Sequence, residues 1–202
     1  KNIHLQVGRR GLFFENICSY ISIAQKLESE FLRVVIDDGN YHPPVEEVIR
    51  IIKELLPVLK QSCITLAIEN HDRFKAKTLV RIIEATDPEL IAICLDTANS
   101  LGAGEGIAEI APVLLPYTVN LHVKDFTIAR VNHKMGFTVS GAPAGEGMLD
   151  IAWLMSECSK YKRCATVTLE TWMNRESTDE QTLAKEMDWI NKSIKYLNNY
   201  TQ

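Results

Sequence analysis

The sequence of 202 residues predicts an α/β fold built on a parallel sheet. Short runs rich in β-branched residues alternate with longer segments of helical period, which is the pattern of repeated strand and helix units. No internal repeat, low-complexity tract or linker marks the start of a second domain. We therefore expect residues 1–202 to form a single domain.

Six short apolar runs are predicted as strands, and the first of them is the weakest because it only alternates between apolar and polar residues. The expected strands are Ile3–Val7, Phe31–Asp37, Ile64–Glu69, Ile91–Asp96, Thr118–Lys124 and Ala165–Glu170.

The segments between the strands are predicted as helices from their apolar spacing and terminal residues. Pro43 and Pro44 open the second helix, whose apolar face should pack on the sheet. Thr178 is the expected cap of the last helix, and its apolar stripe is Leu183, Met187, Ile190, Ile194 and Leu197. The other expected helices are Glu15–Leu27, Lys75–Ala85, Gly106–Leu115 and Ile151–Ser159, and the last helix is Thr178–Asn198.

Composition excludes several classes of function. The 22 basic and 26 acidic residues and a pI near 5.8 give no basic surface for DNA or RNA. No apolar run approaches the roughly 18 residues of a membrane span, and no signal peptide is recognisable. The five cysteines have irregular spacing, so we expect reduced thiols in a soluble, cytoplasmic protein.

The strands separate into two faces, because alternate residues of a strand point to opposite sides. Four strands carry large aliphatic residues on one face and small or polar residues on the other. This pattern is typical of the interior of a (β/α) barrel. The polar faces end in ionisable residues at the carboxyl ends of the strands, namely Glu69, Asp96, His122 and Glu170.

The carboxyl ends of barrel strands converge at one mouth, so these four residues should meet although they are far apart in sequence. A single ionisable group at a strand end is commonly only solvated. Three carboxylates and an imidazole in one small space require neutralisation, and a divalent cation is the simplest means. Oxygen ligands with one histidine favour Mn²⁺, Mg²⁺ or a similar ion.

The residues that carry this pattern also resemble a known family. The strings are Leu66–His71 (LAIENH), Cys94–Asn99 (CLDTAN), Leu121–Asp125 (LHVKD) and Thr168–Glu170 (TLE), with a glycine-rich Gly141–Gly147 before Leu149 and Asp150. In this order they resemble the metal-site motifs of the xylose isomerase-like TIM-barrel superfamily, especially its sugar isomerases and epimerases. The resemblance covers Phe31 to Leu197.

The resemblance implies that Glu69, Asp96, His122 and Glu170 hold one divalent ion, usually Mn²⁺ in that family, with Mg²⁺, Co²⁺ and Zn²⁺ as alternatives. It also implies that Glu69 and Glu170 act as an acid/base pair on opposite faces of a sugar. They would move a proton at a carbon next to a carbonyl, through an enediolate.

Two departures from the family pattern concern the substrate. Many ketose epimerases have a histidine where this chain has Asn99, and the arginine expected after His122 is out of register, with Arg130 the nearest. Our candidates for substrate binding are Asn99, Lys124, Arg130, His133 and His71. The alternative role of Lys124 is to form a local ion pair, and the alternative role of His71 is to cap the following helix.

The length is a third departure. A complete (β/α)8 barrel needs about 250 residues and eight strands, and this chain has six expected strands. We therefore expect a TIM barrel that lacks the first two βα units. Either the natural protein is longer, or a partner chain, as in a homo-oligomer, covers the exposed strand edges.

These expectations favour a metal-dependent isomerase or epimerase acting on a small sugar or sugar derivative. A metal-dependent dehydratase or lyase of a keto-inositol or 3-keto sugar is the closest alternative, because it begins with the same proton abstraction. A non-catalytic sugar-binding barrel is the alternative from another class.

Overall fold

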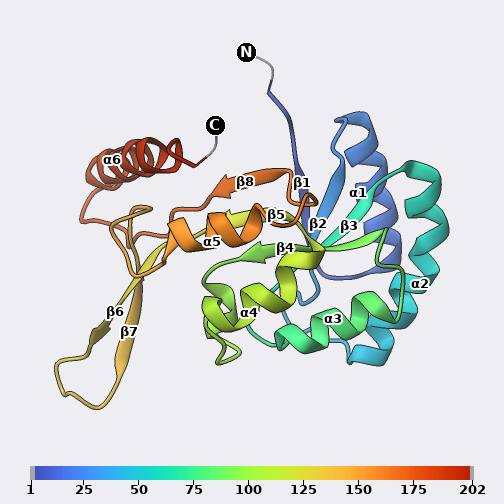
Figure 1. The fold of residues 1–202 in the computed structure, drawn as a ribbon, viewed down its shortest axis with the longest axis horizontal. Helices are drawn as coiled ribbons and strands as arrows, with labels where there is room; N and C mark the ends of the chain where they lie inside the picture. Colours follow the sequence, from blue (N-terminus) through green and yellow to red (C-terminus); the bar gives the residue numbers. More distant parts are fainter. Residues whose placement is uncertain (1–2, 201–202) are drawn as a thin grey trace.

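A computed structural model describes residues 3–200, and its centre is a curled sheet of six parallel strands (Figure 1). The strands follow the order β1-β2-β3-β4-β5-β8, in which each neighbour in the sheet is also the next parallel strand along the chain. Their bounds are β1 Val7–Arg10, β2 Phe31–Val35, β3 Thr65–Glu69, β4 Ile91–Asp96, β5 Thr118–Val123 and β8 Thr166–Leu169. The predicted α/β class and the parallel sheet are therefore confirmed.

The first strand differs from the sequence prediction. β1 begins at Val7, where the predicted strand ended, and pairs with β2 from Val7↔Leu32 to Arg10↔Val35. Ile3 is 81% exposed, so the apolar alternation before Val7 contributes nothing to the core.

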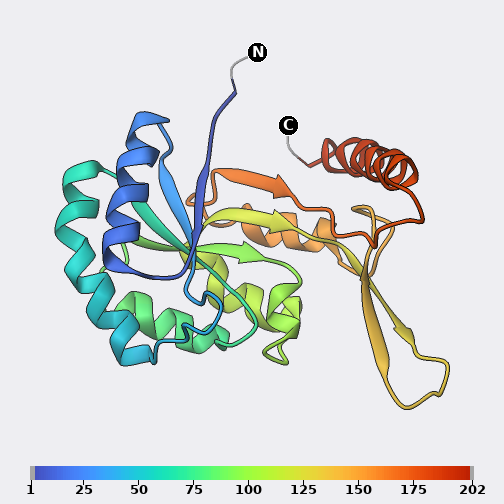
Figure 2. The same cartoon turned by 180° about the vertical axis from the view of Figure 1, so that it is seen from behind.

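Helices α1 to α5 lie along the outside of the curled sheet (Figures 1 and 2). The helices are α1 Phe14–Lys26, α2 Val45–Ser62, α3 Ala76–Glu84, α4 Ile107–Leu114, α5 Ile151–Cys158 and α6 Asp179–Leu197, with short 3₁₀ turns at Asn99–Leu101 and Leu115–Tyr117. Each predicted helix is present, and its ends differ from the prediction by at most two residues. None of the helices in the described part of the chain combines the length and apolar character of a membrane span.

The core lies between these helices and the outer face of the sheet. The fully buried side chains of α2 are Val48, Ile52, Leu55 and Leu59, and they join the aliphatic residues of β3, β4 and β5 in one cluster. Inside the sheet a separate small cluster consists of Phe31, Ala67 and Cys94. The two-faced strands predicted from the sequence are therefore present.

A β-hairpin that the sequence interpretation missed follows β5. Its strands, β6 Phe126–Arg130 and β7 Phe137–Gly141, pair antiparallel and project from the body of the molecule (Figure 1). Neither strand lies in the parallel sheet, and Phe137 is 62% exposed. Because both faces are largely in solvent, the hairpin lacks the burial pattern that identifies the other strands.

The last helix packs less deeply than its apolar stripe suggested. Thr178 caps α6 as predicted, by accepting the backbone N–H of Gln181 at 3.2 Å. Leu183, Met187 and Ile194 are exposed, and the buried residues of α6 are Ser193 and Leu197. Ser193 accepts the backbone N–H of Ala144 at 2.9 Å, so α6 contacts the glycine-rich segment after β7.

That glycine-rich segment is organised by the buried carboxylate of Asp125, which directly follows Lys124. Its oxygens accept the backbone N–H groups of Phe126, Gly145, Gly147 and Leu149 at 2.8 to 3.0 Å. Four donors on one carboxylate fix the segment against the end of β5.

Substitution of Gly147 by alanine should destabilise the fold, because a Cβ atom there would lie 2.1 Å from Asp125 Oδ1 and 2.6 Å from the carbonyl oxygen of Phe126. We expect a loss of at least about 2 kcal/mol in the free energy of unfolding, measured by urea denaturation. Gly106→Ala is the matched control, since no atom lies within 4 Å of its added Cβ, and it should stay within about 1 kcal/mol of the parent. Equal stabilities of the two variants would contradict this packing.

Candidate metal and substrate site

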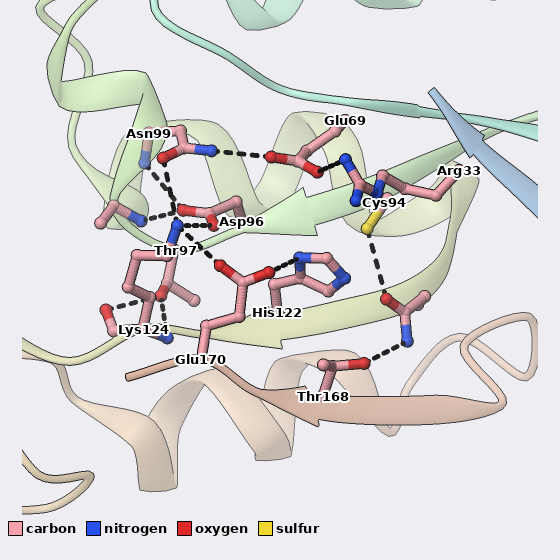
Figure 3. A network of polar contacts seen from close by, with 12 residues as sticks. Arg33, Glu69, Cys94, Asp96, Thr97, Asn99, His122, Lys124, Thr168 and Glu170 are labelled. Atoms are coloured by element: carbon pink, nitrogen blue, oxygen red, sulfur yellow. Dashed lines mark hydrogen bonds and ion pairs between the residues drawn. The ribbon is translucent and has the colours of Figure 1, made fainter. Parts of the chain in front are cut away.

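The four predicted ligands meet at the carboxyl ends of adjacent strands (Figure 3). Glu69 and Asp96 are the last residues of β3 and β4, His122 lies near the end of β5, and Glu170 directly follows β8. Asp96 is in register with His122 across the β4–β5 pair. We refer to Glu69, Asp96, His122 and Glu170 as the ligand cluster.

The potential ligand atoms form two groups that share His122. Those of Asp96, His122 and Glu170 are all within 4.8 Å of one another, and the same holds for Glu69, Cys94 and His122. His122 Nδ1 is 2.8 Å from Glu170 Oε1. The convergence that strand parity indicated is therefore present in the structure.

Asp96 is fully buried and is oriented by the backbone that follows it. Its Oδ1 accepts the N–H groups of Ala98 and Asn99, each at 2.8 Å. The side chain of Asn70 adds a further link, since its Oδ1 accepts the N–H of Asp96 at 2.6 Å and its amide donates to the Asp96 carbonyl at 2.8 Å. These bonds direct the other carboxylate oxygen, Oδ2, toward the middle of the cluster.

Lys124 bridges two of the carboxylates. Its Nζ lies 2.8 Å from both Asp96 Oδ2 and Glu170 Oε2. Burial alone would lower the pKa of Lys124, but the charges and hydrogen bonds of the two carboxylates outweigh burial and raise it. The ammonium is therefore a positive charge held inside the site.

The two glutamates have different surroundings. Burial raises the pKa of Glu69, although Arg33, whose Nη1 lies 3.2 Å from Glu69 Oε2, opposes that effect. The neighbouring His122 and Lys124 lower the pKa of Glu170 to about 2. Their surroundings therefore shift the pKa values of the two glutamates in opposite directions.

The donor set fits a divalent cation. Asp96 Oδ2 and His122 Nδ1 are buried, and neither takes part in a well-directed hydrogen bond within the described residues, although each lies close to a charged neighbour. Oxygen and imidazole ligands suit Mg²⁺, Mn²⁺ and Zn²⁺. These residues could therefore hold a metal ion.

Cys94 lies two residues before Asp96, on the same face of β4. Burial raises the pKa of its thiol well above the usual range, and its Sγ donates to Asn120 Oδ1 at 3.3 Å. Asn120 in turn donates to Thr166 Oγ1 and Thr168 Oγ1 at 2.7 and 3.2 Å. The thiol is thus a protonated member of the hydrogen-bond network beneath the ligand cluster.

The structure brings two of the five predicted substrate-binding residues to the cluster. Asn99 donates to Glu69 Oε1 at 2.9 Å, and its Oδ1 lies 3.4 Å from Lys124 Nζ. His71 lies just beyond β3 and contacts Asp72, with 3.2 Å between His71 Nδ1 and Asp72 Oδ2. It does not cap the next helix, because the capping position of α3 is Lys75.

The other two candidates lie on the hairpin. Arg130 donates to the carbonyl of Lys134 and lies over the ring of Phe137, and His133 lies at the hairpin turn. Neither is brought to the ligand cluster in this structure. Their role in substrate binding stays a prediction.

A cavity of ≈360 Å³ adjoins the cluster at Asn99 and Lys124. Leu101, Val139 and Trp172 form its apolar walls. Trp172 is held in place by donation from its Nε1 to the carbonyl of Asp125 at 3.0 Å. The sequence interpretation missed Trp172, and only its position two residues after Glu170 could have indicated it.

These features define a (β/α) barrel sheet with a cluster of potential metal ligands at its carboxyl end. The model of the xylose isomerase-like TIM barrel family matches residues 8–193, and the chain belongs to that family. It is also 30% identical over 195 residues to a protein named 3-oxo-isoapionate decarboxylase from Pectobacterium atrosepticum, a match that covers 96% of this chain and 71% of the relative.

Solved structures share the fold at low sequence identity. The IOLI protein with a bound zinc atom has a TM-score of 0.70 at 14% identity, covering 97% of this chain and 77% of that one. D-psicose 3-epimerase from Clostridium cellulolyticum H10, solved with D-tagatose, has a TM-score of 0.68 at 14% identity, covering 94% and 71%. Each relative is longer than this chain, and the predicted fold class is confirmed.

Proposed function

We propose that this chain carries the active site of a divalent-metal-dependent enzyme that acts on a keto sugar or keto-sugar acid through an enolate. The observation that supports this proposal best is the ligand cluster, in which three carboxylates and one imidazole converge although up to 101 positions separate Glu69 from Glu170. Mn²⁺ is the ion that we propose, with Mg²⁺, Co²⁺ and Zn²⁺ as alternatives.

All four residues of the ligand cluster would hold the ion. When bound, a divalent ion supplies positive charge that stabilises the enolate oxygen. The side chains of Asn99 and Lys124 reach the same space and would bind the hydroxyl or carbonyl oxygens of the substrate. The apolar walls of the adjoining cavity would exclude water from the reacting carbons.

We favour decarboxylation of a 3-oxo sugar acid as the reaction, because the relative named a decarboxylase aligns over nearly the whole chain. In this reaction the bond between the carboxylate carbon and its neighbour breaks, and its electron pair stays on the neighbouring carbon as the enolate. Carbon dioxide leaves, and an acid then returns one proton to that carbon. Glu69 is our candidate for the acid, because it lies in the cluster at the end of β3.

Isomerisation or epimerisation is the second candidate. The observation in its favour is that the cluster contains two glutamates, Glu69 and Glu170, from strands separated by β4 and β5. A proton removed by one carboxylate could be returned by the other. Elimination of a leaving group from a keto-inositol or 3-keto sugar would use the same first step.

One experiment separates these reactions. The Mn²⁺-loaded protein is incubated in D₂O with a 3-oxo sugar acid and, separately, with neutral ketoses, and the products are followed by NMR and carbon dioxide release. A decarboxylase releases carbon dioxide and places one deuterium on the carbon that lost it. An epimerase exchanges deuterium into a ketose without releasing carbon dioxide. If no substrate gave either outcome, the proposed function would be contradicted.

A further inference from the structure

Arg33 is a cationic side chain on the inner face of β2 that the ligand cluster does not account for. In the sheet it lies between Gly8 of β1 and Ala67 of β3, which are its register partners. Its guanidinium reaches the mouth of the barrel, where Nη1 lies 3.2 Å from Glu69 Oε2 (Figure 3). An arginine is therefore positioned directly beside the proposed acid.

The neighbouring strand makes room for this guanidinium. A Cβ atom on Gly8 would lie 2.6 Å from Arg33 Nη2, 2.8 Å from Nε and 2.9 Å from Cζ. Any side chain at position 8 would therefore displace the arginine head group. The pair of Gly8 and Arg33 acts as one feature, in which the small residue lets the large one lie across the strand.

The guanidinium still has donors to offer. It makes one ion pair, with Glu69, and its nitrogens make no other polar contact within the described residues. The side chain is 30% exposed, so the remaining N–H groups are open to a ligand in the barrel mouth. A planar guanidinium with free donors is the group best suited to bind a carboxylate through two parallel bonds.

The charges of the site favour an anion as the ligand. Three carboxylates, those of Glu69, Asp96 and Glu170, face two cationic side chains, Arg33 and Lys124. With Glu69 ionised, this leaves one net negative charge, which a divalent ion converts into one net positive charge, and a proton on Glu69 adds one more. A substrate carboxylate would offset this positive charge, whereas a neutral sugar would leave it unbalanced.

We propose that Arg33, in the space that Gly8 provides, binds the substrate's carboxylate and thereby selects sugar acids over neutral sugars. This inference rests on the proposed function, because it assumes that the ligand cluster is the active site. It identifies Arg33 as the residue that selects a negatively charged substrate. It also places the carboxylate next to Glu69, where a proton would be needed after carbon dioxide leaves.

The test measures binding of two small probes to the Mn²⁺-loaded protein by calorimetry. D-erythronate carries a carboxylate, and erythritol is its neutral counterpart. We expect the parent to bind erythronate at least tenfold more tightly than erythritol. Arg33→Met should weaken erythronate binding about 10- to 100-fold and leave erythritol unchanged, as expected for the loss of a charge-assisted pair.

Two further variants keep the test decisive. Gly8→Ala retains the arginine but displaces it, and it should lose the preference for erythronate as well. Arg50→Met removes an exposed arginine on the outer surface of α2 and should keep the preference. If Arg33→Met does not fold, Gly8→Ala gives the answer.

A Mn²⁺ titration of each protein distinguishes a failure of the proposed function from a failure of the proposed role of Arg33. A parent that binds no Mn²⁺ would overturn the proposed function itself. A parent that binds Mn²⁺ but shows no preference for erythronate would overturn only the role of Arg33. The same conclusion would follow if the preference survived in Arg33→Met and in Gly8→Ala.

Discussion

Replacement of Glu69 by glutamine is expected to lower kcat about 1,000-fold while leaving the fold intact. Glutamine has the same shape and can still accept the hydrogen bond of Asn99, but it cannot donate or remove a proton. Loss of a general acid or base typically costs 10²- to 10⁴-fold in rate. The measurement is the steady-state rate on the substrate that the D₂O experiment identifies, with circular dichroism to verify the fold.

Glu105→Gln is the matched control for this prediction. Glu105 is also buried, but its Oε2 accepts the backbone N–H of Ala76 at the start of α3, away from the ligand cluster. We expect this variant to keep a rate within about threefold of the parent. A Glu69→Gln enzyme that worked within tenfold of the parent would remove Glu69 from the chemistry.

Replacement of Asp96 by alanine is expected to destabilise the fold by about 3 kcal/mol in the presence of EDTA. The substitution leaves the N–H groups of Ala98 and Asn99 without their acceptor and removes one of the two carboxylates that pair with Lys124. Loss of one partner from a buried ion pair costs about 3–5 kcal/mol. Lys124 keeps Glu170 as a partner, so we expect the lower end of that range.

Urea denaturation measures this loss, and Asp188→Ala serves as its control. Asp188 lies on the exposed face of α6 and pairs with Lys192 at 2.8 Å, so its removal should cost less than about 1 kcal/mol. Similar losses for the two variants would show that the network around Asp96 contributes little to stability.

Strand parity made the ligand cluster predictable from the sequence. Strands β3, β4 and β5 are buried on both faces, so alternate residues separate an aliphatic face from a small or polar face without ambiguity. The parallel order of the strands then forces their carboxyl ends to one edge. Once Glu69, Asp96, His122 and Glu170 were recognised as strand ends, their meeting followed from topology alone.

Other features depend on contacts that the periodic pattern does not contain. The role of Arg33 depends on the absence of a side chain at Gly8, a position on a strand whose start was predicted too early. The hairpin of β6 and β7 is exposed on both faces and falls outside the alternation of strands and helices. The burial of α6 could not be predicted either, because an apolar stripe does not determine which surface of the protein it packs against.

The central claim is that the ligand cluster holds one divalent ion, and calorimetric titration with Mn²⁺ tests it most directly. The parent, His122→Ala and Glu170→Gln are compared, with His133→Ala at the hairpin turn as a control that also removes a histidine. We predict one ion per chain in the parent and the control, and affinities at least about 100-fold weaker in the two cluster variants. A parent without saturable binding, or cluster variants that bind as tightly as the parent, would contradict the claim.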